Sequence, residues 1–174
     1  MTEGMTKMKT LVVYGTKSGC TTGIAERIGA TLAERGMTVD VRPVEKAGDP
    51  SGYDAVVVGS GVRVGSWHAP VKEWVTANAD TLKGLPVAFY TCCLTLATDS
   101  EKVDEVRAYT DALVAESGVT PVDVGLFAGW NEPKSFSLIE RTVMKVMKAP
   151  QGDFRDFDAV AAWAKDMAPR LGAA

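Results

Sequence analysis

The feature that most constrains this chain is the regular alternation of short β-type runs with longer segments of helical period. Five runs rich in Val, Leu and aromatic residues alternate with segments whose apolar residues recur at helical spacing. Alternation of this kind is typical of a parallel sheet covered by helices on both faces. One run, DAVVVGS, is apolar at successive positions, as expected of a strand that is buried on both faces.

The pattern predicts an α/β fold with a doubly wound, five-stranded parallel sheet in the order 2-1-3-4-5 and helices on both faces. The predicted strands cover residues 9–15, 38–44, 54–60, 85–92 and 120–128. The predicted helices cover about residues 20–34, 67–79, 134–148 and 156–171, and a further helix begins with a capping box at residues 98–101. We interpret residues 1–174 as a single domain, with residues 1–8 as a flexible N-terminal tail.

Length, composition and charge exclude several classes of protein. A chain of 174 residues with 46% hydrophobic and 24% charged residues is typical of one globular domain. Its formal net charge of −3 offers no positive field for nucleic acid, so no nucleic-acid partner is expected. No apolar run approaches the ~20 residues that span a bilayer. The first nine residues lack the apolar stretch of a signal peptide, so we expect a cytoplasmic protein.

The cysteines do not form a recognisable metal or redox motif. Cys20, Cys92 and Cys93 are an odd number, and two of them are adjacent, which matches neither a zinc knuckle nor a CxxC pair. We therefore expect reduced thiols and no metal site.

A ligand site is expected at the carboxyl edge of the sheet. In doubly wound sheets, ligands bind beyond the carboxyl ends of the strands, where the strand order reverses. Three predicted loops meet there, at residues 16–22, 61–67 and 93–97.

The first of these loops has the composition of a phosphate site. Four of the eight residues from Thr16 to Gly23 carry a hydroxyl, and the loop leads into a helix whose N-terminal N–H groups and dipole attract an anion. The loop is neither a GxGxxG dinucleotide fingerprint nor a P-loop. The alternative is a hydroxyl-rich turn with an ordinary N-cap. The candidate cofactor-binding residues in it are Thr16, Lys17, Ser18, Gly19, Cys20, Thr21 and Thr22.

The second loop offers groups for an isoalloxazine ring. A flavin ring needs a flat apolar neighbour and close backbone donors, which Trp67 and the two loop glycines can supply. The alternative for Trp67 is packing against the following helix. Arg63 and His68 are weak catalytic candidates, and for His68 the alternative is a capping or surface residue. The candidate cofactor-binding residues in this loop are Ser60, Gly61, Val62, Arg63, Gly65 and Trp67.

These stretches resemble the flavodoxin superfamily, and within it the menaquinone-dependent protoporphyrinogen oxidase (protoporphyrinogen IX dehydrogenase) type. The resemblance rests on KTLVVYGTKSGCTTGIA, DAVVVGSGVRVGSWHAPVKEWV, LPVAFYTCCL and IERTVMKVMKAPQGDFRDFDAVAAWA, which occur in the family's order and cover nearly the whole chain from Lys9. In the first loop Thr16, Gly19 and Thr21 match the family pattern Thr-Arg-Asp-Gly-Gln-Thr, whereas Ser18 and Cys20 depart from it.

The resemblance implies a flavodoxin-like fold, tightly bound FMN, and oxidation of protoporphyrinogen IX, or a similar reduced small-molecule substrate, with delivery of electrons to a quinone. It also extends the cofactor-binding set to the end of the fourth strand, where Cys92-Cys93 replaces a small polar pair. The residues added there are Thr91, Cys92, Cys93 and Leu94.

The segment from Lys134 to Lys148 fits this activity, since apolar and basic residues alternate along it at helical spacing. A basic amphipathic helix can lie on anionic lipid, which would put the protein in peripheral contact with the inner face of the cell membrane, or line the entry for a flat hydrophobic substrate. The alternative is a helix packed on the core with a solvated lysine face.

Other functions remain open from the sequence. A flavodoxin-type electron carrier would be expected to have a markedly acidic docking surface, which a net charge of −3 and a basic segment do not match well. An enzyme of the same fold with another reductant or quinone is also compatible, because the fold fixes the cofactor better than the substrate.

Overall fold

A computed structural model of the chain describes residues 6–132, 134, 136–149 and 151–173. At its centre lies a parallel sheet of five strands in the order β2-β1-β3-β5-β6. In chain order these strands are β1 (Lys9–Gly15), β2 (Thr38–Pro43), β3 (Ala55–Arg63), β5 (Val87–Cys93) and β6 (Asp123–Ala128). This confirms the predicted doubly wound order, 2-1-3-4-5 when the five long strands are numbered alone.

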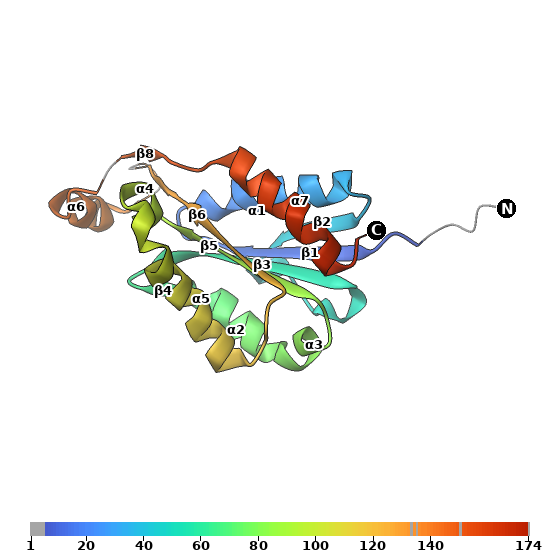
Figure 1. The fold of residues 1–174 in the computed structure, drawn as a ribbon. Helices are drawn as coiled ribbons and strands as arrows, with labels where there is room; N and C mark the ends of the chain where they lie inside the picture. The colour runs from blue at the N-terminus through green and yellow to red at the C-terminus, as the bar shows by residue number, and fades with distance from the viewer. Residues whose placement is uncertain (1–5, 133, 135, 150, 174) are drawn as a thin grey trace.

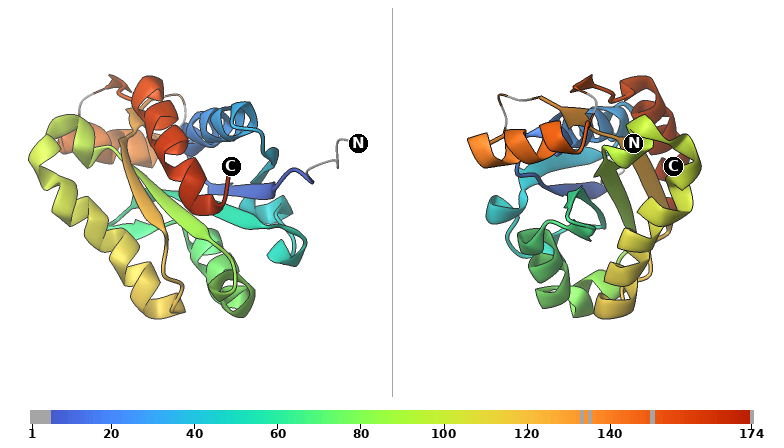
Figure 2. Two further views of the ribbon diagram at one scale, coloured as in Figure 1. Left: turned by 45° about the vertical axis from the view of Figure 1, so that its right-hand side comes forward. Right: turned by 90° about the vertical axis from the view of Figure 1, so that its left-hand side faces the viewer.

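Helices cover both faces of the sheet (Figure 1). On one face lie α1 (Cys20–Glu34) and α7 (Phe157–Leu171), and on the other lie α2 (Ala69–Ala77), α3 (Ala79–Lys83) and α5 (Val103–Ser117), as two further views also show (Figure 2). Each layer has its own apolar core. The predicted apolar face of α1 is confirmed, because Ile24, Ile28 and Leu32 are fully buried against the sheet.

The second predicted helix is wrong at its start. Strand β3 continues past residue 60 to Arg63 and pairs with a short antiparallel strand, β4 (Ser66–Trp67), so Trp67 belongs to a hairpin and α2 begins at Ala69. The helix also breaks at Asn78, before α3. Two 3-10 turns, Val44–Lys46 and Pro50–Gly52, lie between β2 and β3.

The predicted loop at residues 93–97 and the capping box at residues 98–101 also need correction. Cys93 is still in β5, and residues Thr95–Thr98 form a short helix, α4. The cap is formed by Asp99, whose carboxylate accepts from the Glu101 N–H at 3.0 Å and opens a 3-10 turn, Ser100–Lys102, before α5. The Thr98 hydroxyl instead donates to the Thr95 carbonyl, so Thr98 completes α4.

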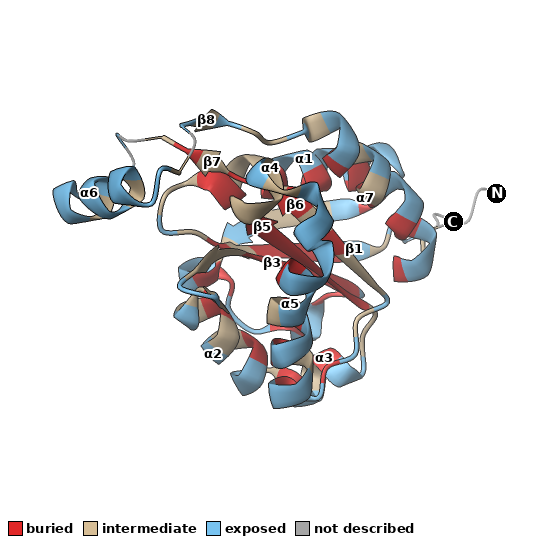
Figure 3. Cartoon of the chain, turned by 60° about the vertical axis from the view of Figure 1, so that its left-hand side comes forward, coloured by how far each residue is buried: buried red, intermediate tan, exposed pale blue. Residues whose placement is uncertain are grey.

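After β6 the chain leaves the main sheet, and two short segments of it pair antiparallel with each other. Strand β7 (Trp130–Asn131) pairs with β8 (Gly152–Asp153), and helix α6 (Leu138–Val146) lies between them in sequence. The helix predicted from Lys134 to Lys148 is thus shorter, and residues 133 and 135 lie outside the described residues. Figure 1 shows α6 at the end of the molecule opposite the two termini, and Figure 3 shows that its surface is mostly exposed.

Part of the predicted N-terminal tail belongs to the folded body. The Met8 carbonyl accepts from the Thr38 N–H at 2.8 Å, and the Met8 side chain packs against the α1/α7 core. Residues 1–5 of that tail lie outside the described residues.

Candidate functional site

The loops predicted to form the site follow neighbouring strands. Gly15, the last residue of β1, is in register with Ser60 of β3, which in turn is in register with Thr91 of β5. The carboxyl ends of these three strands therefore lie side by side, and the segments that follow them start from one edge of the sheet.

The first loop ends in a helix N-terminus that no side chain caps among the described residues. Gly19 precedes α1 with a left-handed backbone (φ 85°), and its N–H donates to the Thr16 hydroxyl at 2.9 Å. That hydroxyl shapes the loop, as the hydroxyl-rich turn of the alternative would have it, but it does not cap the helix, so the N-cap part of that alternative is wrong. The first N–H groups of α1 are left for an anion, because they have no intrahelical partner.

The Thr21 hydroxyl has the burial expected of a cofactor contact. Thr21 is fully buried, and its Oγ1 has no hydrogen-bond partner within the described part of the chain. A Cβ on Gly61 of the second loop would lie 3.4 Å from this oxygen, so the second loop packs closely against the hydroxyl. Because buried hydroxyls are nearly always hydrogen-bonded, an anionic acceptor at the α1 N-terminus fits this donor.

The second loop is a tight hairpin closed by Ser60. The Ser60 hydroxyl donates to the Gly61 carbonyl at 2.7 Å and accepts from the His68 N–H at 2.8 Å. Val64 and Gly65 turn the tip with positive φ, and the Val64 side chain is fully exposed. His68 precedes α2 without capping it through its side chain, and its ring lies beside Gly15 at the end of β1.

Trp67 and Thr91 belong to the core beneath this hairpin. Trp67 is 3% exposed, packs edge-on against Phe89, and donates from Nε1 to the Thr91 hydroxyl at 2.9 Å. Thr91 also shares a hydrogen bond of 2.7 Å with Thr110 of α5. Trp67 is therefore a core residue, but these contacts are with β5 and not with the following helix that the packing alternative named. They leave little of the indole available to a flavin ring.

The remaining predicted residues lie in or near β5 and in the hairpin. The thiols of Cys20 and Cys92 meet at 3.0 Å, while Cys93 is the next residue of the strand and points to the opposite face. Leu94 lies in the turn into α4, and Val62 pairs with Trp67 in the hairpin. Flavin contacts for these residues stay predictions.

Glu140, which the sequence prediction missed, joins α6 to both predicted flavin loops. Its carboxylate contacts the Arg63 guanidinium and lies 3.5 Å from the Lys17 ammonium. A capping box with Ser137 holds the same side chain at the start of α6. The hydrogen bond from the Ser137 N–H, followed by that from Arg63, lowers the pKa of Glu140 to about 2. Glu140 is therefore ionised at neutral pH.

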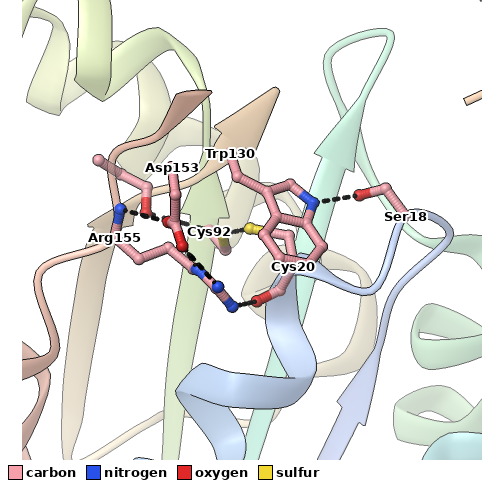
Figure 4. Close-up of polar contacts among 7 residues, drawn as sticks. Ser18, Cys20, Cys92, Trp130, Asp153 and Arg155 are labelled. Atoms are coloured by element: carbon pink, nitrogen blue, oxygen red, sulfur yellow. Dashed lines mark hydrogen bonds and ion pairs between the residues drawn. The ribbon is translucent and has the colours of Figure 1, made fainter. Parts of the chain in front are cut away.

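A second group of residues that the sequence prediction missed lies against the first loop (Figure 4). Trp130 of β7 lies against Gly19 and donates from Nε1 to the Ser18 hydroxyl at 3.3 Å. Arg155 stacks 4.2 Å from the centroid of the Trp130 ring, donates to the Cys20 carbonyl at 3.1 Å, and pairs with Asp153 at 2.7 Å. These residues lie in the segment after β6, the fifth long strand. Because β6 ends at the same edge of the sheet, its position in the sequence could have indicated that the following segment reaches the site.

The family model for the flavodoxin domain matches residues 11–158. The chain belongs to the flavodoxin domain family. Its sheet agrees with that of solved flavodoxins: a flavodoxin from the domain Archaea is 17% identical with a TM-score of 0.62 over 94% of this chain and 99% of that one. The two-electron reduced flavodoxin of Megasphaera elsdenii is 15% identical with a TM-score of 0.58, covering 90% and 98% of the two chains.

Curated relatives of this flavodoxin-domain protein are enzymes. Protoporphyrinogen IX dehydrogenase (quinone) of Escherichia coli strain K12 is 28% identical over 172 residues, which cover 92% of this chain and 95% of that protein. The protein of the same name from Leishmania major is 26% identical and is covered to 74% of its length. The family implies FMN as the cofactor, as the sequence predicted, and the relatives place the chain among flavodoxin-like FMN oxidoreductases.

Replacing Glu140 by Gln is expected to loosen α6 from the flavin loops. The substitution removes the charge that pairs with Arg63 and Lys17, so backbone hydrogen exchange at residues 138–146 should be faster than in wild type. In wild type the same change should develop as the pH falls below the ordinary glutamate pKa and be complete as it passes the pKa of Glu140, about 2. The exposed Glu45→Gln is a matched control. Equal exchange in both variants and wild type would mean that Glu140 does not hold the helix.

Proposed function

We propose that the chain is a single flavodoxin-like domain that oxidises protoporphyrinogen IX, or a similar reduced substrate, with FMN and passes the electrons to a quinone. Similarity to protoporphyrinogen IX dehydrogenase (quinone) over 92% of the chain supports the substrate class. The observation that carries the proposal over an electron carrier is α6, an exposed apolar and basic helix joined through Glu140 to both flavin loops.

FMN supplies two-electron chemistry and acceptance of hydride at its ring when it is bound. The chain provides the binding site. The free N–H groups at the start of α1 and the buried Thr21 hydroxyl would hold the phosphate. Lys17 and Arg63 carry positive charge in the two loops and share the Glu140 carboxylate. Trp130 lies against Gly19 and Ser18 of this loop.

Helix α6 provides a surface suited to a flat hydrophobic partner. Leu138 and Ile139 are each 78% exposed, which does not fit the alternative of a helix packed on the core. Exposed apolar side chains beside basic ones favour peripheral contact with an anionic membrane, where a lipid-soluble quinone resides. Within the described ranges, none of the helices combines the length and apolar character required to span a bilayer.

The proposal is tested by identifying the bound flavin and by reducing it with the proposed substrate. The purified protein should be yellow, and acid should release FMN and not FAD. Protoporphyrinogen should bleach the flavin without oxygen, and a menaquinone analogue should restore its colour. Bleaching only by a reductase or ferredoxin would identify an electron carrier. A colourless protein that FMN does not stabilise against heat would contradict both functions.

A further inference from the structure

Two buried thiols from distant parts of the chain meet beneath the phosphate loop (Figure 4). Cys20 is the first residue of α1 and Cys92 lies in β5, and their sulfur atoms are 3.0 Å apart. The two residues are 6% and 4% exposed. A disulfide requires about 2.05 Å between the sulfurs, so a closure of about 1 Å would join them.

Neighbouring residues leave room for the two sulfur atoms and place a positive charge near them. Gly129 lies behind the sulfurs: a Cβ there would be 3.2 Å from Cys92 Sγ and 3.3 Å from Cys20 Sγ, so any other residue would crowd them. Arg155 is fixed beside Cys20 by its hydrogen bond to the Cys20 carbonyl and by Asp153. The pair therefore has a close cation that is itself held in place.

The two thiols are unequal in acidity. The hydrogen bond from Cys92 lowers the pKa of Cys20. The Trp130 backbone and then the Arg155 charge act in the same direction, against burial and Asp153. The hydrogen bond to Cys20, together with burial, raises the pKa of Cys92 well above its ordinary value. Of the two thiols, Cys20 is therefore the one that loses its proton more readily. A nucleophilic thiolate beside a protonated partner thiol is the arrangement of a reactive and a resolving cysteine.

We propose that Cys20 and Cys92 form a dithiol site that reduces hydroperoxides and closes to a disulfide, tying the start of α1 to β5. In the first step the Cys20 thiolate attacks a peroxide oxygen, the O–O bond breaks, and hydroxide leaves and is protonated to water. The sulfur of Cys92 then attacks the resulting Cys20 sulfenic acid. The S–S bond forms, the S–O bond breaks, and a second water carries away the Cys92 proton. The two electrons lost by the thiols reduce one hydrogen peroxide to two waters.

Cys93 serves as an internal control for this chemistry. It is as buried as the other two cysteines, at 5% exposed, but as the neighbour of Cys92 on a strand it points to the opposite face of the sheet. It should therefore remain a free thiol.

The test treats the folded, full-length protein with hydrogen peroxide, blocks the remaining thiols after unfolding, and maps the peptides by mass spectrometry. Wild type should lose two of its three thiols and yield one linked pair of peptides, carrying Cys20 and Cys92. Its intact mass should fall by two hydrogen atoms and return on reduction. Cys93→Ser should behave in the same way, and Cys92→Ser should give no link.

Several results would overturn the proposal, and wild type alone can give each of them. These are three free thiols after treatment, a link that includes Cys93, a link between two chains, or irreversible addition of oxygen to a single cysteine. Peroxide treatment in denaturant should give mixed pairings, and a single Cys20–Cys92 link there would mean that the folded site does not direct the reaction.

Discussion

Replacing Thr21 by Val is expected to weaken FMN binding about 10- to 100-fold while leaving the flavin-free protein at least as stable as wild type. A hydrogen bond to a charged group contributes about 1.5–3 kcal/mol, and about 1.4 kcal/mol corresponds to a factor of ten in affinity. Val has nearly the same shape as Thr but cannot donate to a phosphate. Without flavin the Thr21 hydroxyl is buried and has no partner among the described residues, so its loss removes a desolvation cost.

The measurement pairs FMN titration with urea unfolding of the flavin-free protein. Thr21→Ser keeps the hydroxyl and should retain most of the affinity. Adding Thr16→Ala to Thr21→Val should weaken FMN binding further, because the Thr16 hydroxyl holds the Gly19 N–H in the loop. Unchanged affinity in a folded Thr21→Val protein would place the phosphate elsewhere, and a destabilised flavin-free protein would mean that the hydroxyl has a structural role.

The sheet could be predicted because its determinants are local and repeated. Apolar runs such as 54–60 and the spacing of Ile24, Ile28 and Leu32 are decided by burial on one or two faces, which the sequence displays directly. The same reasoning predicts a phosphate site at the α1 N-terminus, since an anion site needs a turn and a helix start and both are contiguous in sequence.

The contacts around the site could not be predicted because they join residues far apart in the chain. Arg63 and Glu140 are separated by 77 positions, and Trp130 and Ser18 by 112. Both contacts depend on the excursion between β7 and β8, whose two-residue strands are too short to give a period-2 signal. Trp67 shows the opposite problem: an aromatic residue next to a glycine loop looks like a flavin neighbour, whereas its depth in the core is decided by Phe89 and Thr91 from another strand.

Removing the positive charges of α6 and of Lys148 just beyond it is expected to abolish most membrane binding without affecting the fold. The variant replaces Arg141, Lys145 and Lys148 by Gln. Each basic residue near an anionic surface contributes about 1 kcal/mol, so the triple variant should bind anionic vesicles roughly a hundredfold more weakly. All three side chains are exposed, and exposed substitutions usually change the free energy of unfolding by no more than about 0.5 kcal/mol each.

A control variant separates the role of these three charges from the effect of a change in the net charge of the protein. A control triple, Arg27→Gln, Lys46→Gln and Lys165→Gln, removes the same charge from exposed positions on other elements and should keep vesicle binding. Both triples are assayed by sedimentation with phosphatidylserine-containing vesicles over a range of salt, because binding by these charges should fall as salt rises.

Activity distinguishes a lipid role of α6 from a role in binding a soluble substrate. If the helix brings the flavin to a membrane-bound quinone, the α6 triple should slow reduction of a quinone in vesicles much more than reduction of a water-soluble dye. Equal slowing of both would indicate a soluble substrate or partner site on α6. If wild type does not bind anionic vesicles even at low salt, the lipid interpretation is wrong. The exposed Leu138, Ile139 and Val146 would then have to contact the substrate itself or another protein.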